Sequence, residues 1–252
     1  MQTGPIMQTG PIMERRELRV VSWNVRDLLG DPFAVRRVIT ALAPDVLCLQ
    51  EAPRRLPGVV RNRMLARSCG LLFVAGGRTS GGTAVLVSPR TAVRRAVAAR
   101  LPVRGLFTRS RGLVVAELAA QLPEGPLELT VACLHLPLEP DLRVRHAELA
   151  VAALERRPRP HVVCGDLNEM PGSPAWKVLE RLARDPDPDA APTFPAWGPQ
   201  SRVDAVFVGD GPDVVRYGED GADRHDVLAA TDHLPVVVDL VPSSNPSAGA
   251  TG

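Results

Sequence analysis

The chain contains no aspartate or glutamate between Ala52 and Ala116, although thirteen arginines fall in that stretch. The stretch carries +13, which leaves −11 for the rest of a chain whose formal net charge is only +2. Lysine is nearly missing too, since Lys177 is the only one, and GC-rich coding would produce the same preference for arginine. The alternative is a positive surface beside an anionic ligand, because guanidinium groups match phosphate oxygens. For the block as a whole we favour the positive surface.

Aromatic residues are scarce, at 4% of the chain, and Tyr217 is the only tyrosine. The chain therefore has few rings on which bases could stack, and such stacking is a common way to bind single-stranded nucleic acid. No apolar run approaches the length of a membrane span, and the first residues lack the basic-then-apolar order of a signal peptide. We therefore expect no membrane-spanning segment.

The four cysteines show no short spacing of the kind that zinc sites use. Cys48, Cys133 and Cys164 lie within apolar runs, and Cys69 closes a predicted helix. Buried free thiols are typical of proteins in a reducing compartment, so we expect a cytoplasmic location.

The two ends of the chain differ in composition from its middle. Residues 1–16 contain the hexapeptide MQTGPI twice, and we expect them to be a disordered extension outside the fold. Residues 242–252 are small and polar and are expected to form a disordered tail. With 45% hydrophobic residues and no long linker between these ends, residues 17–241 are predicted to form one domain, and we expect a monomer.

Short β-branched runs bounded by Gly, Pro or Asp predict strands at residues 18–23, 45–50, 71–75, 82–88, 112–118, 127–136, 161–165, 203–208 and 234–240. Residues 91–103 fit a strand or a helix. Helices are predicted to begin at Asp31-Pro32, near Val59, near Asp141 and at Ser173-Pro174. Many strands with helices near both ends of the chain indicate sheet packed on sheet, with helices outside.

Polar side chains recur at the ends of the predicted strands. A lone aspartate or asparagine there is usually a turn former, and a lone histidine is more often structural than catalytic. Repetition weakens these explanations, because six strand ends with carboxylate, amide or imidazole groups would line one rim of a sandwich, where a site is needed. The residues concerned are Asn24, Gln50, Glu51, His135, Asp166, Asn168, Asp204, Asp232 and His233.

Five short motifs, SWN, LQE, GDLN, RVDAVFV and TDH, occur in this order between Ser22 and His233. This series resembles the endonuclease/exonuclease/phosphatase superfamily, whose members include deoxyribonuclease I, abasic-site endonucleases, inositol polyphosphate 5-phosphatases, neutral sphingomyelinases and deadenylases. The resemblance covers nearly all of the expected domain. It implies an α+β fold, a four-layer α/β/β/α sandwich, and metal-dependent hydrolysis of a phosphate ester.

The resemblance also implies a metal site. Phosphate esters are anionic, so water attacks them poorly until their charge is neutralised. Glu51 is the expected ligand for Mg²⁺, with Mn²⁺ as an alternative, and Asn24 and Asp232 are the further candidates. Arg26 stands where abasic-site enzymes commonly have another carboxylate or amide. The neighbouring Asp27 would point away from the site if the strand continued.

The remaining motif residues are implied to act on the phosphate and the attacking water. His233 needs a partner to fix its tautomer, and Asp204 is expected within hydrogen-bonding reach of it. Asp166 would hold or deprotonate the water, and Asn168 would grip a non-bridging oxygen, since alternate residues of an extended chain point the same way. His135 would be a second group on the phosphate, as donor or general acid. Which histidine is the acid and which the base stays open.

Three functions remain open. The first, slightly favoured, is a nuclease that holds DNA or RNA by its backbone without reading sequence. The second is a phosphatase or phosphodiesterase for a small or lipid headgroup substrate. The third is an inactive binding module, which the complete set of motif residues disfavours. Arg109 and Arg111 are the arginines expected to border the site, whereas His146, His161 and His225 match no motif and are expected to be structural or on the surface.

Overall fold

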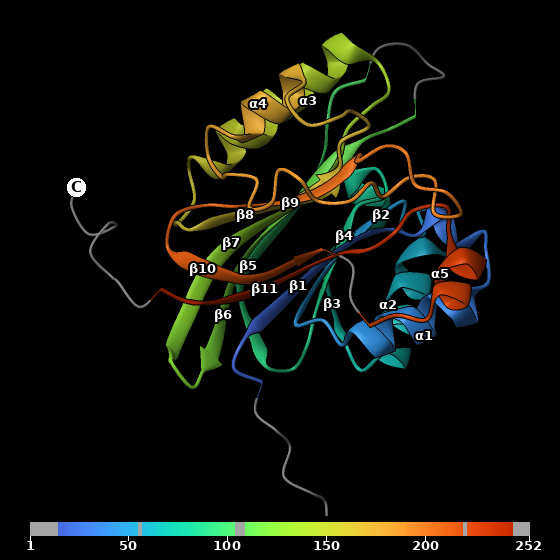
Figure 1. Ribbon diagram of the computed structural model, residues 1–252, viewed down its shortest axis with the longest axis horizontal. Coiled ribbons are helices and arrows are strands. Elements are labelled where there is room, and N and C mark those ends of the chain that lie inside the picture. The colour runs from blue at the N-terminus through green and yellow to red at the C-terminus, as the bar shows by residue number, and fades with distance from the viewer. Residues whose placement is uncertain (1–14, 55–56, 104–108, 219–220, 244–252) are drawn as a thin grey trace, which may run out of the picture.

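The computed structural model describes residues 15–54, 57–103, 109–218 and 221–243. Most of the expected extension and tail, and also Arg55 and Arg104 of the arginine block, lie outside these residues. Within them the chain forms two sheets that pack face to face (Figure 1).

The first sheet has six strands and is mixed. Its spatial order is β10 (Pro212–Gly218), β11 (Val236–Pro242), β1 (Leu18–Asn24), β2 (Val46–Gln50), β4 (Ala84–Val87) and β3 (Leu72–Gly76). The second sheet has five strands, in the order β5 (Thr91–Arg100), β6 (Gly112–Leu122), β7 (Gly125–His135), β8 (His161–Asp166) and β9 (Asp204–Val208).

Helices cover the outer face of each sheet (Figure 1). The six-stranded sheet packs against α1 (Pro32–Leu42), α2 (Gly58–Ser68) and α5 (Arg224–Ala230). The five-stranded sheet packs against α3 (Pro140–Leu154) and α4 (Pro174–Leu179). The predicted four-layer α/β/β/α sandwich is therefore correct. No helix in the described part of the chain is long and apolar enough to cross a membrane.

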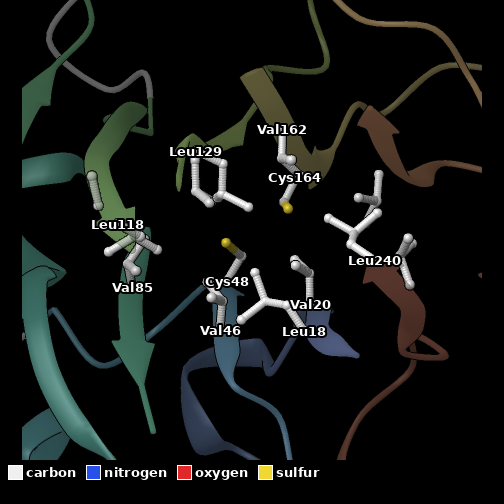
Figure 2. Close-up of a cluster of buried hydrophobic side chains, with 14 of the residues drawn as sticks. Leu18, Val20, Val46, Cys48, Val85, Leu118, Leu129, Val162, Cys164 and Leu240 are labelled. Atoms are coloured by element: carbon white, nitrogen blue, oxygen red, sulfur yellow. The ribbon is translucent and has the colours of Figure 1, made fainter. Parts of the chain in front are cut away.

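The central core lies between the two sheets. Alternate side chains of β1 and β2, such as Val20 and Cys48, face Leu129 and Cys164 of β7 and β8 (Figure 2). The intervening residues, such as Trp23, pack under the helices instead. Because these strands are buried on both faces, their sequences are almost continuously apolar. All four cysteines are free thiols, and all except Cys69 are buried.

Each predicted strand and helix start has a counterpart, and residues 91–100 of the ambiguous segment form strand β5. Two elements were not predicted. Strand β10 begins with Pro212 and has a register irregularity between Val214 and Arg216, so its pattern is broken. Helix α5 is only seven residues long, although Asp223 caps it by accepting from the backbone N–H groups of His225 and Asp226. An aspartate at the N-cap position is visible in the sequence and could have been used to predict the start of α5.

Strand pairing brings the polar strand ends to one rim. Strands β1 and β2 are parallel and end together, with Asn24 opposite Gln50. Strands β7 and β8 are also parallel, with His135 opposite Asp166. Strand β9 runs antiparallel to β8, so its first residue, Asp204, lies opposite Asp166.

Candidate active site

Asp204 and His233 form a buried pair at this rim. The Nδ1 atom of His233 lies 2.9 Å from Oδ2 of Asp204, within the expected hydrogen-bonding reach. The Thr193 hydroxyl donates to the same carboxylate oxygen at 2.7 Å. Trp23 donates its indole N–H to the backbone carbonyl of His233, and the ring of Phe194 lies 4.8 Å from the imidazole ring, centroid to centroid. The imidazole is therefore held on several sides.

The charges around His233 favour its protonated form. Burial alone lowers the pKa of this histidine, but the charge and hydrogen bond of Asp204, with smaller contributions from Asp166 and Asp232, outweigh that effect. The result is a pKa raised to about 9. His233 is therefore a cation at neutral pH, with its Nε2 atom directed toward Asp166 at 3.9 Å.

Asp166 lies between Asn24, Asn168 and the two histidines His135 and His233. Its Oδ2 atom accepts a hydrogen bond from the Asn24 amide at 2.9 Å and lies 3.3 Å from Nε2 of His135. Its Oδ1 atom accepts from the backbone N–H of Asn168 at 3.0 Å. Burial, followed by the negative charge of Asp204, raises the pKa of Asp166 to about 7 even though His233 and these donors lower it. A carboxylate in this range can exchange a proton near neutral pH.

Asn168 reaches the site by a different route from the expected one. Its φ is +51°, so the chain is not extended here and the alternation argument for residues 166 and 168 is wrong. Asparagine tolerates this left-handed conformation, and the turn is closed by the bond from its own N–H to Asp166. The side-chain amide still enters the cluster, 3.1 Å from Nε2 of His135, and donates to the Leu136 carbonyl at 2.8 Å.

His135 differs electrostatically from His233. Burial, and then the positive charges of Arg111, His233, Arg109 and Arg54, lower its pKa well below the usual value. The imidazole is therefore neutral at physiological pH. The site holds one charged and one neutral histidine, both next to Asp166. The sequence left their roles open, and the structure shows that their electrostatic surroundings differ.

A partly buried ion pair that the sequence analysis missed supports the two phosphate-side residues. Arg143 of α3 pairs with Glu169 at 2.9 Å and donates to the backbone carbonyls of Leu138 and Asn168. Glu169 also accepts from the backbone N–H of Trp176 at 2.8 Å, near the start of α4. The pair thus ties together the loops that follow His135 and Asp166. The position of Glu169 directly after the GDLN motif was the one feature of the sequence that could have pointed to this pair.

Glu51 stands just beyond β2 with φ +48°, beside a small pocket. One of its carboxylate oxygens lies 2.9 Å from Nη1 of Arg109. Asp27 lines the same pocket, contrary to the expectation that it would point away. Residues 26–28 all have positive φ and form a short 3-10 turn, so strand geometry does not apply to them. The Oδ1 atom of Asp27 is buried and has no hydrogen-bond partner among the described residues.

The oxygen atoms of Glu51 and Asp27 fit a hard divalent cation, because carboxylates are its preferred protein ligands and one of these atoms is buried without a partner. Both polar atoms of Asn24 are engaged, by Asp166 and by the Arg26 backbone N–H. Asp232 lies 3.6 Å from the Arg26 guanidinium.

A second set of potential metal ligands consists of Asp166, Asp204 and His233, whose ligand atoms lie within 4.8 Å of one another. In that set His233 is already bonded to Asp204, so a cation would have to break the pair. We therefore favour the pocket of Glu51 for the metal.

The unmatched histidines lie away from this cluster, as expected. His146 and His161 are buried and contact the backbone carbonyls of Pro102 and Arg157, whereas His225 is exposed on α5.

Comparison with known proteins identifies the class. The model of the endonuclease/exonuclease/phosphatase family matches residues 21–233, and the chain belongs to that family. Its members hydrolyse phosphate esters, so the protein is a phosphoester hydrolase. A search of curated protein sequences gives no significant match.

Solved structures share the fold at low sequence identity. A mannosyl-6-phosphatase from Bacteroides thetaiotaomicron has a TM-score of 0.70 and 18% identity, covering 89% of this chain and 99% of that one. TDP2 from D. rerio, complexed with a single-strand DNA product, has a TM-score of 0.66 and 16% identity, covering 90% and 99% of the two chains. Human Nocturnin with a bound sulfate has a TM-score of 0.63 and 17% identity, covering 91% and 96%.

Proposed function

We propose that the protein is a Mg²⁺-dependent phosphodiesterase, with nucleic acid as the favoured substrate. The observation that carries the proposal is the position of Asp166, which lies 3.3 Å from the neutral His135 and 3.9 Å from the charged His233. Glu51 and Asp166 both act electrostatically on Arg111. Hydrolysis of a phosphate ester needs a proton acceptor for water and positive charge at the phosphoryl oxygens. This cluster supplies both.

In the proposed reaction, the ionised Asp166 takes a proton from the water whose oxygen attacks phosphorus. The bond from phosphorus to the ester oxygen breaks on the opposite side, and that oxygen leaves with the bonding electrons. Protonated His233, oriented by Asp204, donates a hydrogen bond to the phosphoryl group. Asn168 and neutral His135 contact a non-bridging oxygen, and Arg143 and Glu169 hold their loops in place.

Glu51 would hold the metal, with Asp27 beside it and Asn24 and Asp232 as the outer candidates. When bound there, Mg²⁺ supplies positive charge that polarises the phosphoryl group and stabilises the leaving oxygen. Mn²⁺ is the expected substitute. Glu51 has to exchange its contact with Arg109 for the metal, and the exposed side chain of Arg109 is free to move into solvent.

Arginines near the site support an extended anionic substrate. Arg54, Arg109 and Arg111 line the pocket beside Glu51, and Arg26 lies next to Asp232. The positive surface is narrower than the arginine block suggests, because other members of the block lie elsewhere; Arg94, for example, pairs with Glu128, and Arg90 lies near Asp45. A nucleic acid strand would place neighbouring phosphates against these guanidinium groups.

The narrow positive surface also favours a second candidate, a small phosphate ester. A search for activity decides between the two. The purified protein is tested with Mg²⁺ on plasmid DNA, RNA, nucleotides, a small chromogenic phosphodiester and phospholipids. The variant His233→Ala serves as the blank, and His225→Ala, which changes an exposed histidine on α5, serves as the matched control. Chelator-sensitive cleavage that His233→Ala loses and His225→Ala keeps is the expected result.

Salt dependence separates the substrates further. A nucleic acid releases counterions on binding, so log affinity falls with log salt by about 0.9 per phosphate contacted on duplex DNA. The double variant Arg54→Gln/Arg109→Gln should lower that slope and kcat/KM on DNA while leaving the small diester almost unaffected. Wild-type DNA cleavage by this variant at every salt concentration would favour the small ester.

A further inference from the structure

Arg111 is the anomalous residue of the site. It directly precedes β6 and is only 6% exposed. Its backbone is fixed, because its carbonyl accepts from Leu101 and a methyl group on Gly81 would lie 2.6 Å from its carbonyl carbon. Gly81 has φ +64°, a conformation that favours glycine. The fold therefore packs this segment tightly and places the arginine in the pocket of Glu51.

The guanidinium of Arg111 makes no hydrogen bond or ion pair with any described residue, and its Nε atom is buried without a partner. A buried charge without a partner is costly. Proteins therefore retain an unpaired buried charge mainly where a ligand of opposite charge binds to it.

The other buried arginine in the described part of the chain is paired. Arg202, at 3% exposure, contacts both carboxylate oxygens of Asp185 at 2.8 Å. Arg143 is only partly buried, and its Nε atom lies 2.9 Å from Glu169 in an ion pair, although like Nε of Arg111 it makes no hydrogen bond. Of the two buried arginines, Arg202 and Arg111, Arg111 is the one without an ionic partner among the described residues, and it lies beside the catalytic cluster.

The surroundings of Arg111 point to the class of its missing partner. Burial lowers the pKa of Arg111, and the charges of Glu51 and Asp166 raise it; after burial, the charge of Arg111 has the largest effect on the pKa of His135. An anionic group that pairs with Arg111 must therefore bind between Glu51, Asp166 and His135. In a phosphoester hydrolase this is where the phosphoryl group is bound.

We propose that Arg111 is a catalytic residue whose guanidinium binds two non-bridging oxygens of the phosphoryl group. The planar guanidinium fork matches such a pair of oxygens. The inference deepens the proposed function and rests on it for the identity of the substrate. Its own content, an anion site completed by Arg111, can be tested without turnover.

The test compares Arg111→Met with Arg202→Met by thermal unfolding in metal-free buffer, with and without inorganic phosphate. Arg202→Met should lower the Tm, because it leaves Asp185 buried and unpaired. Arg111→Met should keep or raise the Tm, because it removes a buried charge that lacks a partner. Phosphate should raise the Tm of the wild-type protein but not that of Arg111→Met, since a ligand stabilises only the state that binds it.

Two further measurements sharpen the assignment. The dissociation constant for phosphate should rise by about tenfold or more in Arg111→Met, which corresponds to about 1.4 kcal/mol. Arg111→Lys should recover part of the phosphate binding but not all of it, because an ammonium group cannot bind two oxygens in a fork. On the small phosphodiester, kcat/KM should fall in the same order.

The proposal is overturned if Arg111→Met has a lower Tm than the wild-type protein without phosphate, or does not fold, since the arginine would then be structural. It is equally overturned if Arg111→Met binds phosphate as the wild-type protein does. These outcomes leave the proposed function intact if the wild-type protein cleaves diesters. Conversely, phosphate binding that depends on Arg111, in a protein without diesterase activity, would reject the function and keep the anion site.

Discussion

Replacing Asp204 with asparagine tests the charged pair at the centre of the site. The substitution keeps the shape of the side chain but removes the negative charge that faces Nδ1 of His233 at 2.9 Å. The pKa of His233 is raised from 6.5 to about 9, against the effect of burial, mainly by Asp204. Each pKa unit is worth about 1.4 kcal/mol, so the net rise of the pKa of His233 corresponds to about 3.5 kcal/mol of stability.

The sign of this contribution fixes its pH window. The pKa of His233 is higher in the folded protein than in the unfolded one. The stabilisation is therefore fully present below pH 6.5 and is lost as the pH rises through about 9. Asp204→Asn should accordingly cost on the order of 3 kcal/mol more at pH 6 than at pH 10. Asp166 and Asp232, which still raise the pKa of His233 in the variant, reduce this difference, and burial, which lowers that pKa, increases it.

Urea unfolding of wild-type protein and Asp204→Asn at the two pH values measures this difference, with equal m values as the check on compactness. Asp232→Asn is the control, since Asp232 has a smaller effect on the pKa of His233 than Asp204 has. Loss of the Thr193 hydrogen bond adds a cost that is the same at both pH values. A destabilisation that does not change between pH 6 and pH 10 would refute the charged pair.

Three other outcomes are expected. In Glu51→Ala the activity should need much more Mg²⁺ with little change in Tm, and an unchanged metal titration would exclude Glu51 as the ligand. The profile of kcat/KM against pH should be bell-shaped, because Asp166 gains a proton below about 7 and His233 loses one above about 9, with Mg²⁺ moving the acid limb lower; a flat profile would contradict these roles. Gly81→Ala should lose about 1–3 kcal/mol and weaken phosphate binding by displacing Arg111. Gly172→Ala, which has a similar φ but open space around it, should show only the conformational part of that loss.

Much of the fold could be predicted from the sequence because buried segments have recognisable patterns of apolar residues. Strands β1, β2, β7 and β8 are buried on both faces, so their residues are apolar almost without interruption. Helix α1 was marked by Asp31 and Pro32, and Asp31 does accept from the backbone N–H of Phe33. Strand β10 is half exposed and irregular, and its sequence has no comparable pattern.

The site also has features that the sequence predicts and features that only the folded structure shows. The sequence by itself determined which residue types stand at the strand ends, and their order resembled one family because the chemistry of phosphate esters demands those groups. Through the same resemblance it also assigned Asp204 as the partner of His233.

Only the tertiary structure decided the details that depend on contacts between distant segments. The positive φ values at Asp27 and Asn168 redirect both side chains, and no period in the sequence encodes them. His135 is neutral because of its burial and the charge of Arg111, and His233 is charged because of Asp204; Arg111 and Asp204 lie far from these histidines in the chain. The unpaired state of Arg111 is a property of its surroundings, because a sequence records which residues exist but not which of them lack a partner.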